Sequence, residues 1–187
     1  MIKKIFIILT LCFCSIEAIG QEVSGVFVSP YVGIRLPIQE ASKKYKTGFS
    51  FGGNLEYGNS AIPFIIRLGF NYTSFPQKGI YNQTYQSSSI TGVNLGFDYL
   101  ITPLIASESI VAPFISADFN YNYIERQLIY YTYRFETDLK IDQKFGFTLG
   151  AGISLFLVDF VVKYNFLIYE PYLSLDYKLR LPIYVSF

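Results

Sequence analysis

The stretch GFSFGGNLEY, residues 48–57, decides the fold. Its bulky side chains all stand at odd positions, whereas the even positions hold Gly, Ser, Asn and Glu. A strand turns successive side chains to opposite faces, so this spacing gives one apolar face and one small, polar face. A helix would spread the same apolar residues around its axis. The stretch therefore predicts a β-strand.

The same alternation recurs along the chain. It is clear at 91–101, 145–157 and 173–187, and weaker at 25–36, 62–73, 110–124 and 158–167. Together with 48–57 this makes eight strands, most of them as long as the roughly 9–11 residues that cross a bilayer at a tilt. An open sheet edge in hydrocarbon would leave backbone groups unpaired. We therefore predict an all-β fold, a transmembrane antiparallel up-and-down β-barrel of eight strands.

The size of the apolar side chains indicates whether the apolar face points into the barrel or outward. The 187-residue chain has 17 Tyr, 18 Phe and only 16% charged residues. Eight strands enclose a space that ordinary side chains just fill, so rows of Phe, Leu and Tyr from every strand would overfill it. We expect the apolar face to meet lipid and the polar face to line the lumen. A soluble, lipocalin-like barrel with the apolar face inward is the alternative.

The first twenty residues have the features of a secretion signal. Lys3 and Lys4 are followed by a short apolar run at 5–14. The small residues Ala18 and Gly20 stand near the end of the segment. The apolar run is too short to span a bilayer. We predict a signal peptide over 1–20 and a barrel domain over 21–187. A lipoprotein anchor at Cys12 or Cys14 is the alternative, which the bulky residues before each cysteine disfavour.

The connections between the predicted strands differ in length. An even strand number puts both termini in the periplasm, so alternate connections face outward. The outer connections are 37–46, 74–88, 125–140 and 168–171, and the inner ones are 58–61, 102–109 and 157–158. Three of the four outer connections are longer than every inner one, which is typical of outer-membrane barrels.

Strand parity predicts which charges face the lumen. They are the acids Glu56, Asp98, Asp118, Asp159 and Asp176 and the bases Arg35, Arg67, Lys163, Lys178 and Arg180. A buried charge is costly unless it is paired and hydrogen-bonded. We therefore predict a charge network centred on Arg67, Asp98, Asp118, Lys163 and Arg180. Such a network either plugs the barrel or forms an electrostatic gate in a narrow ion path.

Several classes of chemistry are disfavoured. The chain has no His, and its two Cys lie inside the predicted signal, so neither a Ser–His pair nor an imidazole or thiolate metal site is available. With 15 basic and 14 acidic residues, the charge balance gives no case for nucleic acid as a partner. We predict a non-enzymatic protein without cofactor or metal; an enzyme working through carboxylates is the alternative.

Two outer segments are candidates for recognition. The residues Tyr130, Tyr131, Tyr133, Arg134 and Phe135 form either a protruding hairpin that binds an extracellular protein or glycan, or an aromatic girdle with a strand extension. The connection 74–88, with Phe75, Tyr81 and Tyr85, has the same two interpretations. The basic residues Lys43, Lys44 and Lys46 either contact lipopolysaccharide phosphates or belong to a solvated loop.

Two short segments carry a resemblance to a known family. Residues 18–22 read AIGQE, and the last strand ends LRLPIYVSF at 179–187. With its Gly-interleaved strands, the chain resembles the outer-membrane β-barrel domain family of Bacteroidota (PorT-like, or porin family), and in strand count the small OmpX and OmpA barrels. The resemblance implies the outer membrane of a Gram-negative bacterium. The alternating C-terminal residues Tyr177, Leu179, Leu181, Ile183, Val185 and Phe187 look like the signal that the barrel assembly machinery reads; Pro182 is a departure from it.

The function that these features favour is a structural or surface-interaction role, exercised by a barrel with a plugged polar lumen. Its expected partners are outer-membrane lipid, lipopolysaccharide, the assembly machinery and an extracellular protein or glycan. A narrow porin-like channel or transporter for ions or small apolar solutes is the alternative.

Overall fold

The structure, a computed structural model, describes residues 24–59, 62–79, 84–101, 111–131, 135–155, 157–167 and 170–186. The predicted signal, 1–20, lies outside them. Nearly all of the described chain is β-strand, with one short helix. The elements are β1 (Ser24–Pro37), α2 (Ala41–Lys44), β2 (Gly48–Asn59), β3 (Ile62–Phe75), β4 (Thr84–Leu100), β5 (Val111–Tyr131), β6 (Phe135–Leu155), β7 (Val158–Phe166), β8 (Tyr172–Leu179) and β9 (Leu181–Ser186).

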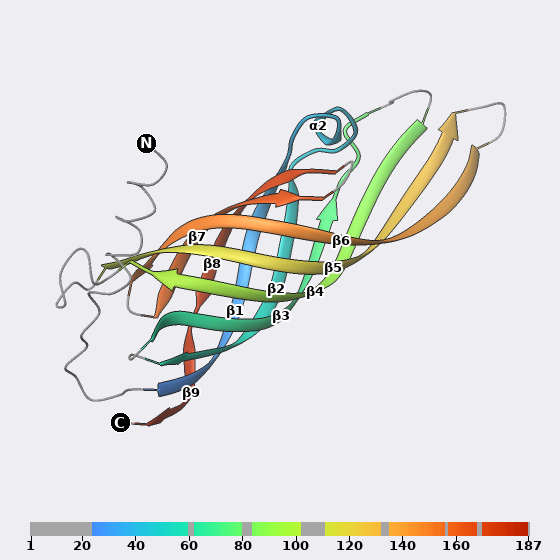
Figure 1. Cartoon of the computed structure of the whole chain (residues 1–187). Helices are drawn as coiled ribbons and strands as arrows, with labels where there is room; N and C mark the ends of the chain where they lie inside the picture. The colour runs from blue at the N-terminus through green and yellow to red at the C-terminus, as the bar shows by residue number, and fades with distance from the viewer. Residues whose placement is uncertain are drawn as a thin grey trace, which may run out of the picture.

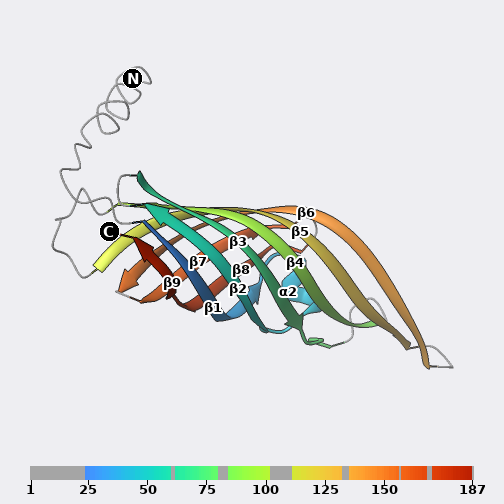
Figure 2. The same ribbon diagram turned by 90° about the horizontal axis from the view of Figure 1, so that it is seen from below.

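The strands close into a barrel (Figure 1). Each strand from β1 to β7 pairs antiparallel with the next along the chain, and β1 also pairs with β8 and β9 on its other edge. Figure 2 shows the wall wrapping around on itself. Since β8 and β9 are two halves of one interrupted strand along β1, the wall has eight strand positions. The predicted all-β, antiparallel, eight-stranded barrel is confirmed.

The interruption of the last strand was not predicted. The pairing of β9 with β1 shifts register between Val26 and Phe27, where Pro182 stands opposite Phe27. Proline has no N–H to donate to the ladder, so the regular pairing fails there. Beyond it, Tyr184 lies opposite Val26 and Val185 opposite Gly25. Leu181, Ile183, Tyr184 and Val185 are all exposed, at 48%, 64%, 61% and 37%, so burial does not separate two faces in this segment, and Phe187 lies outside the described residues.

Bulky side chains cover the outside of the barrel. Leu68 and Phe119 are 60% and 59% exposed, and neighbouring strands contribute ring pairs such as Phe51–Tyr72, with centroids 5.3 Å apart. The polar face points inward, where Ser50 and Glu56 are fully buried. Among the described residues, no helix is long and apolar enough to cross a bilayer.

Three strands run past the end of the barrel. The pairing of β5 with β6 continues without a break to Tyr131 opposite Phe135, and β4 follows β5 from Thr84 onward. Figures 1 and 2 show this three-stranded extension reaching beyond α2. The prediction of loops over 125–140 and 74–88 was therefore wrong for most of the first and part of the second, because backbone pairing persists where the alternation weakens.

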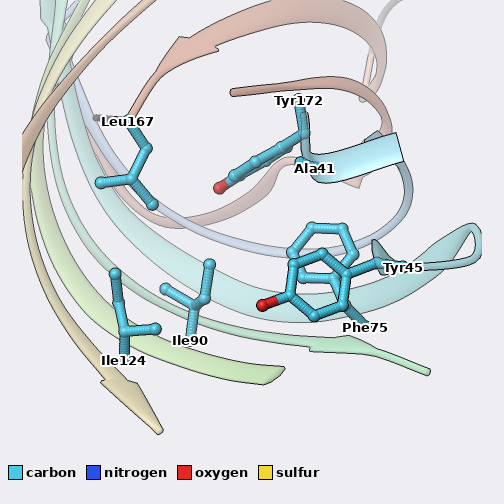
Figure 3. Packing of buried hydrophobic residues seen from close by; sticks show 7 residues of the cluster. All are labelled: Ala41, Tyr45, Phe75, Ile90, Ile124, Leu167 and Tyr172. Carbon is cyan, nitrogen blue, oxygen red and sulfur yellow. The ribbon is translucent and has the colours of Figure 1, made fainter. Parts of the chain in front are cut away.

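An apolar cluster closes the same end of the barrel (Figure 3). It consists of Ala41, Tyr45, Phe75, Ile90, Ile124, Leu167 and Tyr172, all of them buried. The segment 38–47, which contains α2, folds over the opening and supplies Ala41 and Tyr45; we call it the lid. Phe75 is 3% exposed, so its predicted place on the outer surface is wrong. The Phe75 ring packs 5.7 Å from the Tyr45 ring and 5.4 Å from that of Tyr172.

Candidate functional site: the lumen and the outer end

Arg67 on β3 lies at the centre of an ion-pair network inside the barrel. Its Nη2 is 2.8 Å from Asp98 Oδ1 and 2.8 Å from Asp118 Oδ1. Lys163 on β7 donates from Nζ to the other oxygen of Asp118, also at 2.8 Å. Arg67, Asp98 and Asp118 are each at most 2% exposed. Removing an ion from water costs several kcal/mol, which the attraction of a close opposite charge can offset. Each of these three charged groups has such a partner.

A second group of charges joins the first. Lys178 Nζ lies 2.8 Å from Glu56 Oε1 and 2.8 Å from Asp159 Oδ2, and 3.7 Å from Asp98 Oδ2. Arg180 donates to Glu56 at 2.9 Å and to Asp159 at 2.7 Å. The connected network thus balances four acids against four bases: Glu56, Asp98, Asp118 and Asp159 against Arg67, Lys163, Lys178 and Arg180. Arg35 and Asp176 form a separate pair.

Inward-facing glycines make room for these side chains. A Cβ on Gly96 would stand 2.1 Å from Asp118 Oδ1 and 2.9 Å from Arg67 Nη2. A Cβ on Gly33 would stand 2.1 Å from Asp176 Oδ1. The Gly-interleaved pattern of the sequence therefore reflects the space that large charged side chains need in a narrow barrel.

A small polar chamber lies between the charge network and the apolar cluster. Its cavity of about 40 Å³ is lined by asparagines and hydroxyls, and roughly 10–15 Å³ suffices for one water. A hydrogen-bonded chain runs along its wall: Asn120 donates to Thr148 at 2.7 Å, and Thr148 donates to Asn165 at 2.9 Å. A second cavity of about 20 Å³, lined by Arg67, Lys178 and others, shares Tyr31, Asn94, Lys163 and Asp176 with the first.

The lid is fixed by backbone and side-chain bonds. Lys46 N–H donates to the Pro76 carbonyl at 2.9 Å, and Ile38 N–H donates to the Pro171 carbonyl at 3.1 Å. Beneath it, the Tyr45 hydroxyl donates to Glu170 Oε1 at 3.0 Å. Burial, with the Glu170 carboxylate close by, raises the pKa of Tyr45. The phenol therefore keeps its proton and its hydrogen bond at neutral pH.

A cluster of three charges supports the lid from the barrel wall. Arg126 donates from Nε to Glu170 Oε1 at 2.6 Å and pairs with Asp142 on β6. On the outer side of β5 the apolar and aromatic residues end near Tyr123 and give way to Glu125 and Gln127, so this cluster lies above the apolar band. The hydrogen bond from Arg126 lowers the pKa of Asp142. The sequence did not predict this cluster, because Arg126 and Glu170 lie in the predicted connections 125–140 and 168–171, and Asp142 lies just before the predicted strand 145–157.

The candidate recognition residues fall at the tip of the extension. Tyr130 lies opposite Glu136 and Tyr131 opposite Phe135, at the end of the β5–β6 pairing. Tyr133 and Arg134 lie outside the described residues. The predicted basic group is in the lid, where Lys43 Nζ forms an exposed pair with Glu40 Oε1 at 2.7 Å. Of the predicted C-terminal signal, Tyr177, Leu179 and Leu181 are exposed on the outer face.

Metal ligands are not grouped in the described part of the chain. It contains no cluster of three or more His, Cys, Asp or Glu residues arranged to hold an ion. The lumen carboxylates instead face arginine and lysine groups, which compete for the same oxygens.

Comparison with known proteins shows the fold. No protein-family model matches the chain, and no curated protein sequence matches it. The structure is similar to that of Neisserial surface protein A (NspA), with a TM-score of 0.56 at 15% identity, over 85% of this chain and 97% of NspA. Ail, the attachment invasion locus protein of Yersinia pestis, aligns at 12% identity and a TM-score of 0.45, over 89% of this chain and 100% of Ail. Ail in complex with the heparin analogue sucrose octasulfate aligns at 9% identity and a TM-score of 0.46, over the same shares.

Proposed function

We propose that the chain is a non-enzymatic, integral outer-membrane barrel of a Gram-negative bacterium, whose lumen is plugged and whose extension is displayed outside the cell. The observation that carries this proposal is the inverted distribution of side chains. Leu68, Phe119 and many other apolar residues are exposed on the outside, whereas ten charged residues point inward. Such a surface is unfavourable in water and suited to lipid.

The plug has three supports. The charge network crosses the lower lumen, the chamber above it has space for only a few waters, and the apolar cluster under the lid closes the outer end. An electroneutral network in a narrow barrel has little tendency to admit an ion. In this proposal, the aromatic tip of the extension binds an extracellular protein or glycan, and the lid lysines contact lipopolysaccharide phosphates.

One observation favours the alternative, a narrow channel for ions. The two cavities share four lining residues, so polar side chains continue from the chamber to Lys178. A channel would need the lid to open and the ion pairs to rearrange, whereas a plug needs neither.

Two finer assignments rest on sequence motifs alone. The PorT-like family of Bacteroidota is suggested by AIGQE at 18–22 and by the C-terminal strand, which would also be read by the assembly machinery. Cleavage after Gly20 predicts Gln21 as the first residue of the mature protein. N-terminal sequencing of protein from outer membranes tests this directly; a chain that begins at any other residue overturns the predicted cleavage site.

Labelling of intact cells tests the orientation. In a chain carrying Cys12→Ser and Cys14→Ser, Leu139→Cys places a thiol in the extension and Asn59→Cys places one at the opposite end of the barrel. A bulky maleimide polymer that cannot cross the outer membrane should label only Leu139→Cys on intact cells and both variants after lysis. Labelling of Asn59→Cys alone on intact cells would invert the orientation, and a soluble, unlipidated protein would end the membrane proposal.

A further inference from the structure

The outer half of β6 has a free edge. β5 pairs with β6 along its full length, but on the other side the pairing with β7 begins only at Phe147 opposite Phe166. Among the described residues, none pairs with β6 on that side between Phe135 and Gly146. Figure 2 shows β6 at the margin of the extension. A free edge presents backbone N–H and C=O groups that an added strand can complete.

The side chains along this edge have a regular charge pattern. Asp138, Lys140, Asp142 and Lys144 alternate in sign on one face of the strand. On the other face, Leu139, Ile141 and Phe145 are 59%, 47% and 79% exposed. Edge strands that are protected against pairing with identical strands often carry charges of one sign. Alternating signs instead permit antiparallel pairing with an identical strand, and one alignment gives all four charges an opposite partner.

That alignment is antiparallel and centred on Ile141. It places Ile141 opposite its own copy, Lys140 opposite Asp142, and Asp138 opposite Lys144. A twofold axis repeats each contact, so all four charges of each copy face an opposite charge. A parallel, in-register alignment would place each charge beside the same charge. Moving the antiparallel centre to Leu139 would place Glu136 opposite Asp142.

We infer that the free edge of β6 pairs with the same edge of a second copy in an opposing membrane. This step rests on the orientation proposed above. The twofold axis of an antiparallel pair is normal to the sheet, and the extension continues the barrel wall, so that axis lies in the membrane plane. It therefore turns the second copy upside down. Two copies in one membrane are related by an axis along the membrane normal, which would align their β6 strands parallel and turn their charged faces to opposite sides, so the opposite charges could not pair.

The partner in this contact is another molecule of the same chain, and the product is a sheet with three strands from each copy. Opposed outer surfaces, of cells or of vesicles, would then adhere to each other. The contact adds main-chain hydrogen bonds along about ten residues, the cross-strand charge pairs, and apolar contacts of Ile141 with itself.

Disulfide cross-linking tests the register. In the Cys12→Ser, Cys14→Ser chain reconstituted in liposomes, Ile141→Cys should cross-link to itself under mild oxidation. Leu139→Cys and Gln143→Cys should each fail alone, because residues four positions apart are roughly 13 Å apart, beyond the reach of a disulfide. Vesicles carrying Leu139→Cys mixed with vesicles carrying Gln143→Cys should cross-link. Self-cross-linking of all three variants would exclude an antiparallel register centred on Ile141 and overturn the inference.

Charge exchange tests the pairing independently. Asp138→Lys and Lys144→Asp should each abolish aggregation of proteoliposomes, measured by light scattering, because like charges then face each other. The double variant, and a mixture of the two single-variant vesicle populations, should restore it. Aggregation that is absent in the unaltered protein, or unchanged in both single variants, would refute the inference. Cell labelling at Leu139→Cys does not depend on aggregation, so the proposed orientation stands or falls separately.

Discussion

The lumen and the outer half of β6 carry the same kind of side chains in different surroundings. In both, charged side chains alternate with apolar ones along the strand and lie on the inner face of the wall, as Asp118 does on β5 and Lys140 on β6. In the lumen the wall closes, and Glu56, Asp118 and Arg67 are almost fully buried against opposite charges. Above the barrel the wall does not close, and Asp138 and Lys140 are exposed on the same face.

The comparison shows that closure decides what a charge contributes. A charge in the lumen must find its partner within the chain, because water is excluded and an unpaired ion is costly. The exposed charges Asp138 and Lys140 on the extension are solvated, so they can take part in recognition at little cost to stability.

Loss of the central lumen base should have the largest effect. Arg67→Met leaves Asp98 without its close partner and Asp118 with Lys163 alone, and should lower the free energy of unfolding by about 3–5 kcal/mol. Lys140→Met, the matched change on the extension, should alter it by less than about 0.5 kcal/mol. Urea unfolding, followed by heat-sensitive gel mobility, measures both. Equal effects of the two substitutions would show that the lumen network does not stabilise the barrel.

Truncation of the lid anchor should act more locally. Tyr45 is 3% exposed and packs on Phe75, so Tyr45→Ala should favour lid opening by roughly 3 kcal/mol. Hydrogen exchange of amides in the 41–46 segment should then be about a hundredfold faster, while exchange in β5 is unchanged. Lys46→Ala, on the exposed side of the lid, serves as the control. Uniform acceleration over the whole barrel would show that the lid is not a separate unit.

Shortening the extension should leave the barrel intact. Gln127 and Leu139 lie opposite each other, so residues 128–138 can be replaced by an Asn-Gly turn. We expect the urea midpoint to stay within the error of the unaltered protein, because the described residues of the removed segment pair only with each other and with the first three residues of β4, Thr84–Gln86. Vesicle aggregation should disappear. A large loss of stability would mean that the extension is part of the fold rather than a displayed segment.

Acidification should affect the charge cluster under the lid only weakly. Arg126 lowers the folded-state pKa of Asp142 below its ordinary value of 3.8, so its stabilisation is present above that value and is lost as pH falls through the folded pKa. The difference in thermal midpoint between the unaltered protein and Asp142→Asn should therefore be constant from pH 8 to 5 and decrease only as the pH falls below about 3.8. A difference that vanishes near pH 6 would contradict this assignment.

Parity explains what the sequence could predict. The bulk of the outer residues determines the direction of each strand face, and the inward set from Arg35 to Arg180 follows by counting in twos. The same count, continued along β5 and β6, would have reached Arg126 and Asp142. The predicted strand ends at 124, because polar residues such as Ser87 and Ser89 obscure the alternation in the neighbouring strand β4.

Other features of the fold could not be predicted from the local alternation of residues. The lid depends on which strand ends the closed barrel brings near Tyr45, notably Phe75 and Tyr172, and these are far apart in the sequence. The register shift inside β9 depends on the strand that pairs with Pro182, because a proline is tolerated or not according to the ladder bond it would have to make.

Single-channel conductance of the folded protein in a planar bilayer tests the central claim, a plugged lumen. Folding is first established by heat-sensitive gel mobility, and an open porin is the positive control. The account predicts no conductance steps at any voltage that the bilayer tolerates, for the unaltered protein and for Tyr45→Ala alike, because the network under the chamber remains. Reproducible steps that change when Arg67 or Asp118 is neutralised would contradict the plug and make the lumen charges the walls of a channel.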